Sequence, residues 1–209
     1  DKKDQVIFEI EKITNNEANI FYLDQNKPIK KINIENFNFV ISNLSGYISD
    51  FSMNINELNF KNNFGVQIND FKSKFEFKDG RLVLDDTKLD FTNSEIKGLF
   101  VLDFKKFYRN NFLNFDDLES ANIKLEIIDS KIIPKDLNSI FSESLITNTD
   151  YWKLDIKVEG DLSDLNINKL NLISTDDSVS FKGNFSNYFN EKKEFAFQIE
   201  EIEIKSSSN

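Results

Sequence analysis

Three pairs of adjacent aspartates come nearest to a catalytic arrangement in this chain: Asp85-Asp86, Asp116-Asp117 and Asp176-Asp177. Two carboxylates on either side of a glycosidic bond are what a glycoside hydrolase needs. Adjacent residues on a strand point to opposite faces, however, and aspartates are frequent in turns. We therefore interpret the pairs as solvated turn residues and predict that the chain is not an enzyme.

Histidine and cysteine are both absent from this 209-residue chain. Their absence excludes disulfides, thiolate and imidazole nucleophiles, and the zinc and copper sites that these side chains build. The spacing of an EF-hand calcium loop, with alternating acidic residues before a glycine, does not occur either. We expect no catalytic residue, no metal site and no cofactor.

The formal net charge of −10 limits the ligands that the chain suits. Nucleic acid needs a basic footprint, and an anionic membrane surface repels an acidic chain. The longest apolar run, Gly98 to Leu102, is far shorter than the roughly 20 residues that cross a bilayer. We expect no nucleic-acid partner and no membrane span. Because the chain opens at Asp1 without methionine, we expect residues 1–209 to be a single β-rich segment of a longer protein.

A lone tryptophan, Trp152, stands beside Tyr151 at the start of an alternating segment. An exposed indole could serve as a carbohydrate platform, but an indole in this position is more often part of a core. The aromatic bias of the chain lies elsewhere, in 22 phenylalanines against five tyrosines. Phenylalanine has no polar group, so a surface made of it suits other side chains or hydrocarbon equally well.

Alternating residue types predict the strands that must position these side chains. From Phe71 to Lys78, phenylalanine or serine takes one parity and charged residues take the other. A period of two is typical of a half-buried strand. Asp79-Gly80 follows, and Leu82 and Leu84 then resume the alternation. This sequence predicts a hairpin closed by a two-residue turn.

Alternation recurs with little between the segments, which predicts an all-β antiparallel meander with one apolar and one charged face. Helical spacing is confined to one short helix near 134–142, beginning at Pro134. The segment from Phe104 to Leu118 has two interpretations, a long loop or a short helix. The other predicted strands contain Ile32 and Ile34, Phe37 to Ile41, Phe51 to Ile55, Phe64 to Ile68, Ile123 to Ile127, Trp152 to Val158, and Phe195 to Ile199.

Two stretches look like copies of one hairpin, Leu89 to Gly98 and Leu172 to Gly183. Each passes from an alternating strand through a turn of threonine, asparagine, aspartate or serine into a strand that ends in Lys-Gly. A third stretch, Ile156 to Ile167, runs from a strand through Gly160 to two spaced leucines. A weak internal hairpin repeat is therefore predicted at 89–98 and 172–183.

These stretches, together with Ile133 to Leu137, resemble the AsmA-like superfamily and in particular the TamB family (translocation and assembly module, inner-membrane component) of the Bacteroidetes type. The resemblance covers residues 64–186. It implies a β-taco, an elongated sheet curled into a trough with an apolar interior. It also implies a periplasmic segment whose parent protein is anchored in the inner membrane of a Gram-negative bacterium. Phospholipid transport, outer-membrane protein assembly and an outer-membrane β-barrel partner are the functions that this family suggests.

The apolar parity of the predicted strands supplies the expected lining of a groove for phospholipid acyl chains. Moving a sixteen-carbon chain from hydrocarbon into water costs about 12 kcal/mol, at about 0.8 kcal/mol per methylene, so transport requires such shelter. The alternative is a structural or adhesive β domain with a closed phenylalanine-rich core that binds protein partners on its outside or edges. The predicted lining residues are Phe51, Met53, Ile55, Phe64, Val66, Ile68, Phe71, Phe75, Phe77, Leu82, Leu84, Leu89, Phe91, Ile96, Ile123, Leu125, Ile127, Leu154, Ile156, Val158 and Phe181.

Overall fold

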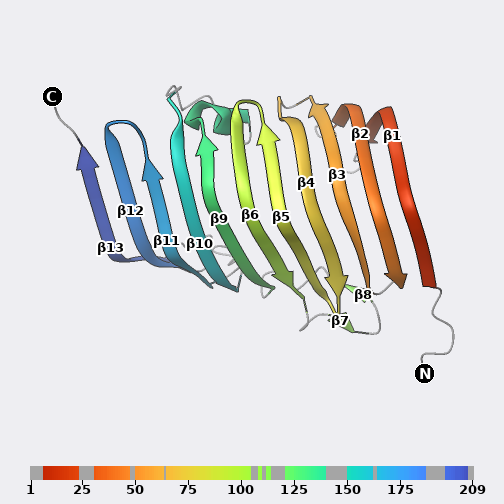
Figure 1. The fold of residues 1–209 in the computed structure, drawn as a ribbon. Coiled ribbons are helices and arrows are strands. Elements are labelled where there is room, and N and C mark those ends of the chain that lie inside the picture. Colours follow the sequence, from red (N-terminus) through yellow and green to blue (C-terminus); the bar gives the residue numbers. More distant parts are fainter. Residues whose placement is uncertain are drawn as a thin grey trace.

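One antiparallel sheet of eleven strands dominates the fold, running as a meander from β1 at one edge to β13 at the other (Figure 1). The sheet is curled but not closed, which confirms the predicted all-β, trough-like meander. The structure is a computed structural model. It describes residues 7–23, 31–47, 50–63, 65–104, 108–109, 112–113, 121–139, 150–161, 164–186 and 196–206.

The strands of the sheet follow the order of the chain, and each packs mainly against its sheet neighbours. Two short strands, β7 (Tyr108–Arg109) and β8 (Phe112–Leu113), lie between β6 and β9 in sequence and form a separate two-stranded sheet. The strands of the main sheet are β1 Ile7–Leu23, β2 Lys31–Tyr47, β3 Phe51–Asn62, β4 Gln67–Lys78, β5 Arg81–Phe91, β6 Ser94–Asp103, β9 Asn122–Ile132, β10 Trp152–Asp161, β11 Asp164–Ile173, β12 Asp177–Ser186 and β13 Ala196–Ser206.

Two predicted elements take a different form from the one expected. The stretch from Phe104 to Leu118 contains the short β7–β8 pair in its described part, rather than a helix or a structureless loop. The helix expected near 134–142 is a 3-10 helix, η2 (Pro134–Ser139), and residues 140–142 lie outside the described residues. Its expected start at Pro134 is confirmed.

The hairpin predicted at Asp79-Gly80 is confirmed. Lys78 and Arg81 are cross-strand partners at the ends of β4 and β5, and the two residues between them form the turn. Asp79 and Gly80 have φ values of 50° and 73°. Positive φ at both central residues is the requirement of a type I′ turn, which is why an Asp-Gly dipeptide closes this hairpin.

Cross-strand partners lie on the same face of a sheet, so the strand register identifies the two faces. One face is apolar from strand to strand. A single row of successive partners crosses it from β3 to β10: Met53, Phe75, Leu84, Phe100, Leu125 and Val158. Buried side chains on this face include Phe91, Ile127 and Leu154. The apolar face is therefore the inner face of the curled sheet.

The opposite, outer face carries charged side chains that pair across neighbouring strands. Lys88 of β5 lies 3.0 Å from Glu95 of β6, and Lys157 of β10 lies 3.1 Å from Glu126 of β9. Such pairs between exposed groups contribute little to stability, with a median of about 0 to 1 kcal/mol. Lys88 stands directly opposite Lys97, so its ion pair with Glu95 runs diagonally across the two strands and offsets the repulsion between the lysines.

Extra residues interrupt the pairing on every second strand from β5 to β13. We call this set the bulge row: Asp85-Asp86, Ile128-Asp129, Asn168-Lys169 and Glu200-Glu201. A bulge bends its strand and increases the local twist. Asp86 and Asp129 take left-handed φ values of 48° and 50°, which aspartate tolerates better than most residues. The bulge row explains how an antiparallel sheet of this size becomes a trough.

Two glycines lie on the strands between these bulges. A Cβ on Gly98 would stand 2.0 Å from the backbone oxygen of Glu126, and one on Gly183 would stand 2.3 Å from the backbone oxygen of Gln198. Both positions therefore require glycine, because neighbouring strands approach too closely for a side chain. Gly98 and Gly183 are also the glycines that end the two hairpin stretches noted in the sequence.

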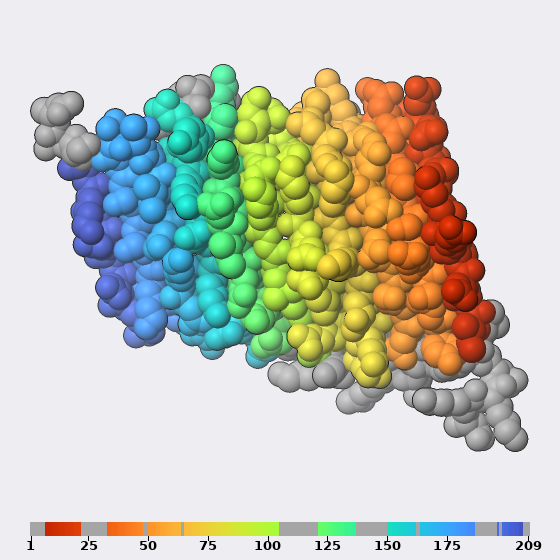
Figure 2. Space-filling view, viewed as in Figure 1, coloured from red at the N-terminus to blue at the C-terminus, as the bar shows by residue number. Residues whose placement is uncertain are grey.

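The buried core is small and lies in the middle of the sheet. Ile127, Ile132 and Leu154 form it, with partly buried aliphatic residues of β6, β9, β10 and β11 packed around them. The accessible surface is 14430 Å², whereas a compact monomer of 24.4 kDa exposes about 10,000 Å². Figure 2 shows the side chains of successive strands forming one uninterrupted surface from β1 (red) to β13 (blue). The molecule is an open sheet rather than a closed sandwich.

Candidate functional site

The inner face of the curled sheet, which we call the trough, gathers nearly all the predicted lining residues. Cross-strand partners place them in rows, as in Phe71–Leu89–Ile96 and Phe77–Leu82. Two predicted residues differ. Val66 precedes β4 instead of lying on a strand, and Phe64 lies outside the described residues. The others on the trough are Phe51, Met53, Ile55, Ile68, Phe75, Leu84, Phe91, Ile123, Leu125, Ile127, Leu154, Ile156, Val158 and Phe181.

Aromatic rings concentrate in the part of the trough nearest β1. The ring of Phe51 stacks on that of Phe75 at a centroid distance of 5.4 Å, and lies 6.0 Å from Phe77 and 6.4 Å from Phe8. These rings contact one another, yet each remains partly exposed. They form one wall of the trough and leave apolar surface for a ligand.

Exposure of apolar residues rises towards β13. Ile199 and Ile202 are each 52% exposed and Ile204 is 67% exposed. Their cross-strand partners on β12 are Gly183, Phe181 and Val179, which belong to the trough. Burying these isoleucines would be favourable by about 25 cal/mol per Å² of apolar surface. This region can therefore contribute binding energy to an apolar ligand.

Several trough residues escaped the sequence prediction. Bulges change the parity of a strand partway along, so Ile167 and Leu170 both lie on the inner face although they are three residues apart. A break of alternation around paired polar residues, as at Asn168-Lys169, is the signal that could have identified them. The trough residues missed for β6, β11, β12 and β13 are Phe100, Leu102, Leu165, Ile167, Leu170, Leu172, Val179, Phe185, Ile199, Ile202 and Ile204.

Small polar side chains occur on the inner face beside the bulges. The hydroxyl of Ser73 donates to the backbone oxygen of Asp85 at 3.1 Å and lies 2.9 Å from the hydroxyl of Thr87. Ser130, fully buried, accepts the backbone N–H of Lys97 at 2.8 Å. These hydroxyls satisfy backbone groups that a bulge leaves unpaired, which lowers the cost of burying them.

A polar latch fixes η2 to one end of the sheet. The carboxylate of Asp136, 7% exposed, accepts the hydroxyl of Ser94 at 2.7 Å and the backbone N–H of Asn93 at 3.0 Å. Ser94 in turn accepts the backbone N–H of Ile133 at 2.9 Å. The turn between β5 and β6 is thereby joined to the start of η2. We assign Asp136 a structural role because its oxygens are held by neighbouring groups.

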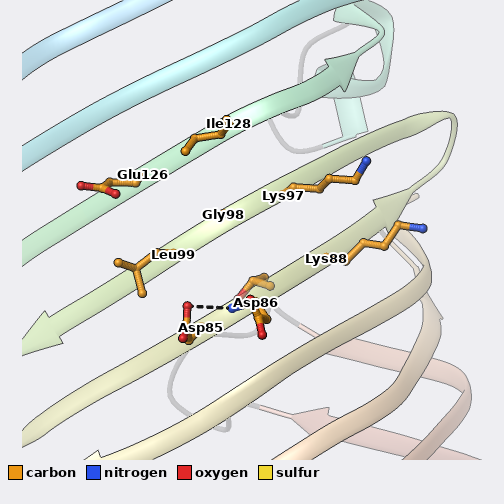
Figure 3. A pocket seen from close by; sticks show the side chains of 9 residues that line it. Asp85, Asp86, Lys88, Lys97, Gly98, Leu99, Glu126 and Ile128 are labelled. Carbon is orange, nitrogen blue, oxygen red and sulfur yellow. Dashed lines mark hydrogen bonds between the residues drawn. The ribbon is translucent and has the colours of Figure 1, made fainter.

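The outer face has a shallow depression of about 370 Å³ at the bulge row, which Figure 3 shows. Asp85 and Asp86 come from β5, Lys97 and Leu99 from β6, and Glu126 from β9. Acids and lysines alternate around it, as they do along the rest of this face. Its lining resembles the ordinary ion-paired outer surface, and the apolar trough lies on the other side.

The two aspartate pairs that the structure describes lie at a bulge and at a turn. Asp85 accepts the backbone N–H of Asp86 at 2.9 Å, and Asp86 forms an ion pair with Lys74. Contrary to the prediction of a turn, these two residues form a bulge inside β5, because the bulge needs a residue with left-handed φ. Asp176-Asp177 does lie at the turn into β12, where the Asp177 N–H donates to Ser174. Asp116-Asp117 lies outside the described residues.

The pKa shifts of the carboxylates on the outer face agree with a structural role for their charges. Hydrogen bonds from Lys97 and Lys88 lower the pKa of Glu95, and bonds from Lys157 and Lys124 lower that of Glu126. The backbone N–H of Asp129 and the ammonium of Lys169 lower the pKa of Asp155. Carboxylates held ionised by lysine partners are poor general acids at neutral pH.

Among the described residues, no cluster of three or more acidic, histidine or cysteine side chains could hold a metal ion. The same part of the chain contains no helix of the length and apolarity needed to cross a membrane. Comparison with protein-family models, with curated proteins and with solved structures finds no match. Function must therefore be inferred from the geometry of the trough and from the chemistry of its lining.

Proposed function

We propose that this chain is a section of a lipid conduit, in which the trough shields phospholipid acyl chains during transport between the inner and outer membranes. The observation that carries the proposal is an apolar face continued from strand to strand across an unclosed sheet. An exposed apolar surface that continues across several strands usually marks a binding surface.

The dimensions of the trough suit acyl chains. Eleven strands spaced about 4.8 Å apart extend roughly 48 Å across the sheet. One leaflet of a bilayer is about 15 Å of hydrocarbon, half of the roughly 30 Å core, so the trough is about three acyl-chain lengths long. Hydrocarbon can move along a surface of phenylalanine, isoleucine and leucine at nearly constant free energy. The transport step needs no catalytic residue.

The trough has a lining that selects tails rather than head groups. The hydroxyls of Ser73 and Ser130 on this lining are hydrogen-bonded to backbone groups of the protein. A head group would lose hydration against such a surface, because burying an unpaired polar group is unfavourable. Head groups therefore stay in solvent at the open side of the sheet. We expect binding to depend strongly on acyl-chain length and weakly on head-group type.

The cellular setting is part of the same proposal. From the resemblance of residues 64–186 to the TamB family, we propose that the chain is periplasmic and belongs to a parent protein anchored in the inner membrane. An outer-membrane β-barrel would be the receiving partner, and assembly of outer-membrane proteins a second role. The alternative, a structural or adhesive domain, assumed a closed phenylalanine-rich core, and the unclosed sheet favours the conduit over it.

A charge placed in the trough tests the proposal. We expect native mass spectrometry and lipid extraction to find phospholipid on the purified chain, and a Phe75→Arg variant to lose it. The matched control is Glu76→Arg, which changes the next residue of β4 on the outer face and should retain lipid. Circular dichroism confirms that both variants are folded. Lipid-free wild-type protein, or equal lipid on both variants, would contradict the conduit.

A further inference from the structure

The short helix η2 lies against the inner face of the sheet. Phe91 and Ser94 are cross-strand partners at the end of the β5–β6 hairpin, and both side chains face the trough. The Ser94 hydroxyl donates to the carboxylate of Asp136 in η2 at 2.7 Å and accepts the backbone N–H of Ile133 at 2.9 Å. The chain that leaves β9 is therefore held on the trough side. Figure 1 shows η2 at the end of the sheet where β5 turns into β6.

The inner face of β5, β6 and β9 is buried at the η2 end and open at the other end. Near η2, Phe91 and Ser94 are each 3% exposed and Ile132 is 8% exposed. The inner residues at the opposite ends of the same strands are all partly exposed: Leu82, Leu102 and Ile123. Large apolar side chains occur at both ends. We attribute the difference in exposure to η2, which is hydrogen-bonded to Ser94 itself.

Two rows of inner residues lie away from η2, and we call them the lane. Cross-strand pairing makes each row continuous from β3 to β9, and every member is partly exposed. In the η2 half, by contrast, the side chains of Ile132 and Leu154 are buried. The lane is therefore the part of the trough where hydrocarbon can contact several strands in succession. Its rows are Met53–Phe75–Leu84–Phe100–Leu125 and Phe51–Phe77–Leu82–Leu102–Ile123.

The hydrogen bonds of the latch decide whether a lipid could displace η2. An acyl chain could cover the apolar side chains of Phe91 and Ile132 as well as η2 does. It offers no acceptor, however, to the Ser94 hydroxyl and the Asn93 N–H, which donate to Asp136. Replacing η2 by hydrocarbon would leave these donors without a partner, which is unfavourable. The polar contacts of Asp136 thus keep η2 in place when lipid is present.

We propose that Asp136 is a positioning residue for lipid. Through η2, it excludes acyl chains from the half of the trough that contains Phe91 and Ile132 and confines them to the lane. The proposal rests on the conduit function and specifies where in the trough the hydrocarbon lies. Asp136 acts through η2 and not by touching the lipid. Loss of its carboxylate should therefore widen the lipid-binding surface rather than abolish binding.

Thiol labelling measures the cover without any lipid. The chain contains no cysteine, so Ile132→Cys and Ile123→Cys each introduce a single thiol, at the two ends of β9 on the same face. On protein freed of lipid, we expect maleimide to modify Ile123→Cys about tenfold faster than Ile132→Cys. Adding Asp136→Ala should remove the difference, whereas Asp136→Asn, which keeps an acceptor, should preserve it. Equal rates in otherwise wild-type protein, or a difference that survives Asp136→Ala, would overturn the proposal.

A phospholipid with a photoreactive diazirine in its acyl chain then locates the hydrocarbon. We expect mass spectrometry of digested wild-type protein to find crosslinks at lane residues such as Leu82 and Leu102, and none at Phe91 or Ile132. Asp136→Ala should add crosslinks at Phe91 and Ile132, whereas Asp136→Asn should keep the wild-type pattern. Circular dichroism verifies that both variants are folded.

The outcomes separate this proposal from the conduit itself. Wild-type crosslinks at Phe91 and Ile132 as frequent as those in the lane would overturn the exclusion by η2 and leave the conduit proposal intact. A folded Asp136→Ala protein with the wild-type crosslink pattern would overturn the role of Asp136. Absence of crosslinks from the whole inner face would contradict the conduit, and this proposal with it. The comparisons within wild-type protein hold even if Asp136→Ala does not fold.

Discussion

The middle of the sheet and its last strand obey the same alternation but differ in what surrounds them. Ile127 of β9 and Leu154 of β10 are 9% and 4% exposed, whereas Ile202 and Ile204 of β13 are 52% and 67% exposed. All four are apolar residues on the inner face. The difference shows that one repeated pattern can build a core in one place and an accessible apolar surface in another.

The number of neighbouring strands accounts for this difference in exposure. Strands β9 and β10 have a strand on each side, and Ile132, at the end of β9, is joined through the chain to η2 and its latch at Asp136. Among the strands that the structure describes, β13 pairs with β12 alone. We therefore expect the middle strands to contribute most of the stability and the outermost strands to contribute more to ligand binding. Variants that separate these two properties can test the comparison.

The largest expected effect comes from truncating the core. We expect Leu154→Ala to lower the free energy of unfolding by about 3 kcal/mol, because it removes methyl groups from a packed site and leaves a cavity. Ile202→Ala, the matched change on β13, should cost less than about 1 kcal/mol because the side chain is half exposed. Urea denaturation measures both. Equal losses would show that the core is not confined to the middle.

The close approach of strands at the bulge row gives the next largest effect. Gly98→Ala would place a methyl group 2.0 Å from the backbone oxygen of Glu126, so β6 and β9 must separate. We expect a loss of about 2 to 3 kcal/mol in thermal or urea unfolding. Lys97→Ala, at the adjacent outward position, should change stability by less than about 1 kcal/mol. A Gly98→Ala protein as stable as the wild type would exclude this close approach of β6 and β9.

Removing the latch at Asp136 should have an intermediate effect on the free energy of unfolding. Asp136→Ala leaves the Ser94 hydroxyl and the Asn93 N–H without their acceptor. We expect a loss of about 2 kcal/mol, together with faster amide hydrogen exchange in the turn between β5 and β6. Lys135→Ala changes an exposed neighbour in η2 and serves as the control. Unchanged exchange at the turn in the Asp136 variant would show that the latch does not order it.

Removing an ion pair from the outer face should have the smallest effect on stability, and this effect should depend on pH. Lys157 and Lys124 hold the pKa of Glu126 below its ordinary value. The stabilisation is therefore present above the ordinary carboxyl pKa and is lost as the pH falls through the lower folded-state pKa. Glu126→Gln should cost less than about 1 kcal/mol at pH 7 in urea denaturation. A difference that stays constant down to about pH 3 would contradict an ionic origin.

The parts of the fold that follow from local chemistry were predictable from the sequence. Alternation identified most strands and the apolar parity, and Asp79-Gly80 identified a turn that requires two positive φ values. Strand β1 was not predicted because a polar run from Thr14 to Asn19 interrupts its alternation. There the Asn15 side chain donates to the backbone oxygen of Phe37 at 2.7 Å. Polar residues can thus be part of an irregular strand.

The bulge row was the main feature that the sequence analysis missed. Asp85-Asp86 was interpreted as a turn, because the residue types that suit turns also suit left-handed positions within a strand. Which inner residues meet across strands depends on the number of extra residues in each bulge. Local alternation does not contain that information, since one extra residue reverses the face of everything after it. The trough residues of β11 and β13 were missed for this reason.

The neighbour-by-neighbour packing of the meander has an evolutionary consequence. Because each strand contacts chiefly the strands beside it, a hairpin can be gained or lost without repacking residues elsewhere, as in solenoid proteins. A two-strand increment preserves both the chain direction and the orientation of the apolar face, and it changes the span by roughly 10 Å. Descendants of such a protein can thus lengthen or shorten the sheet one hairpin at a time.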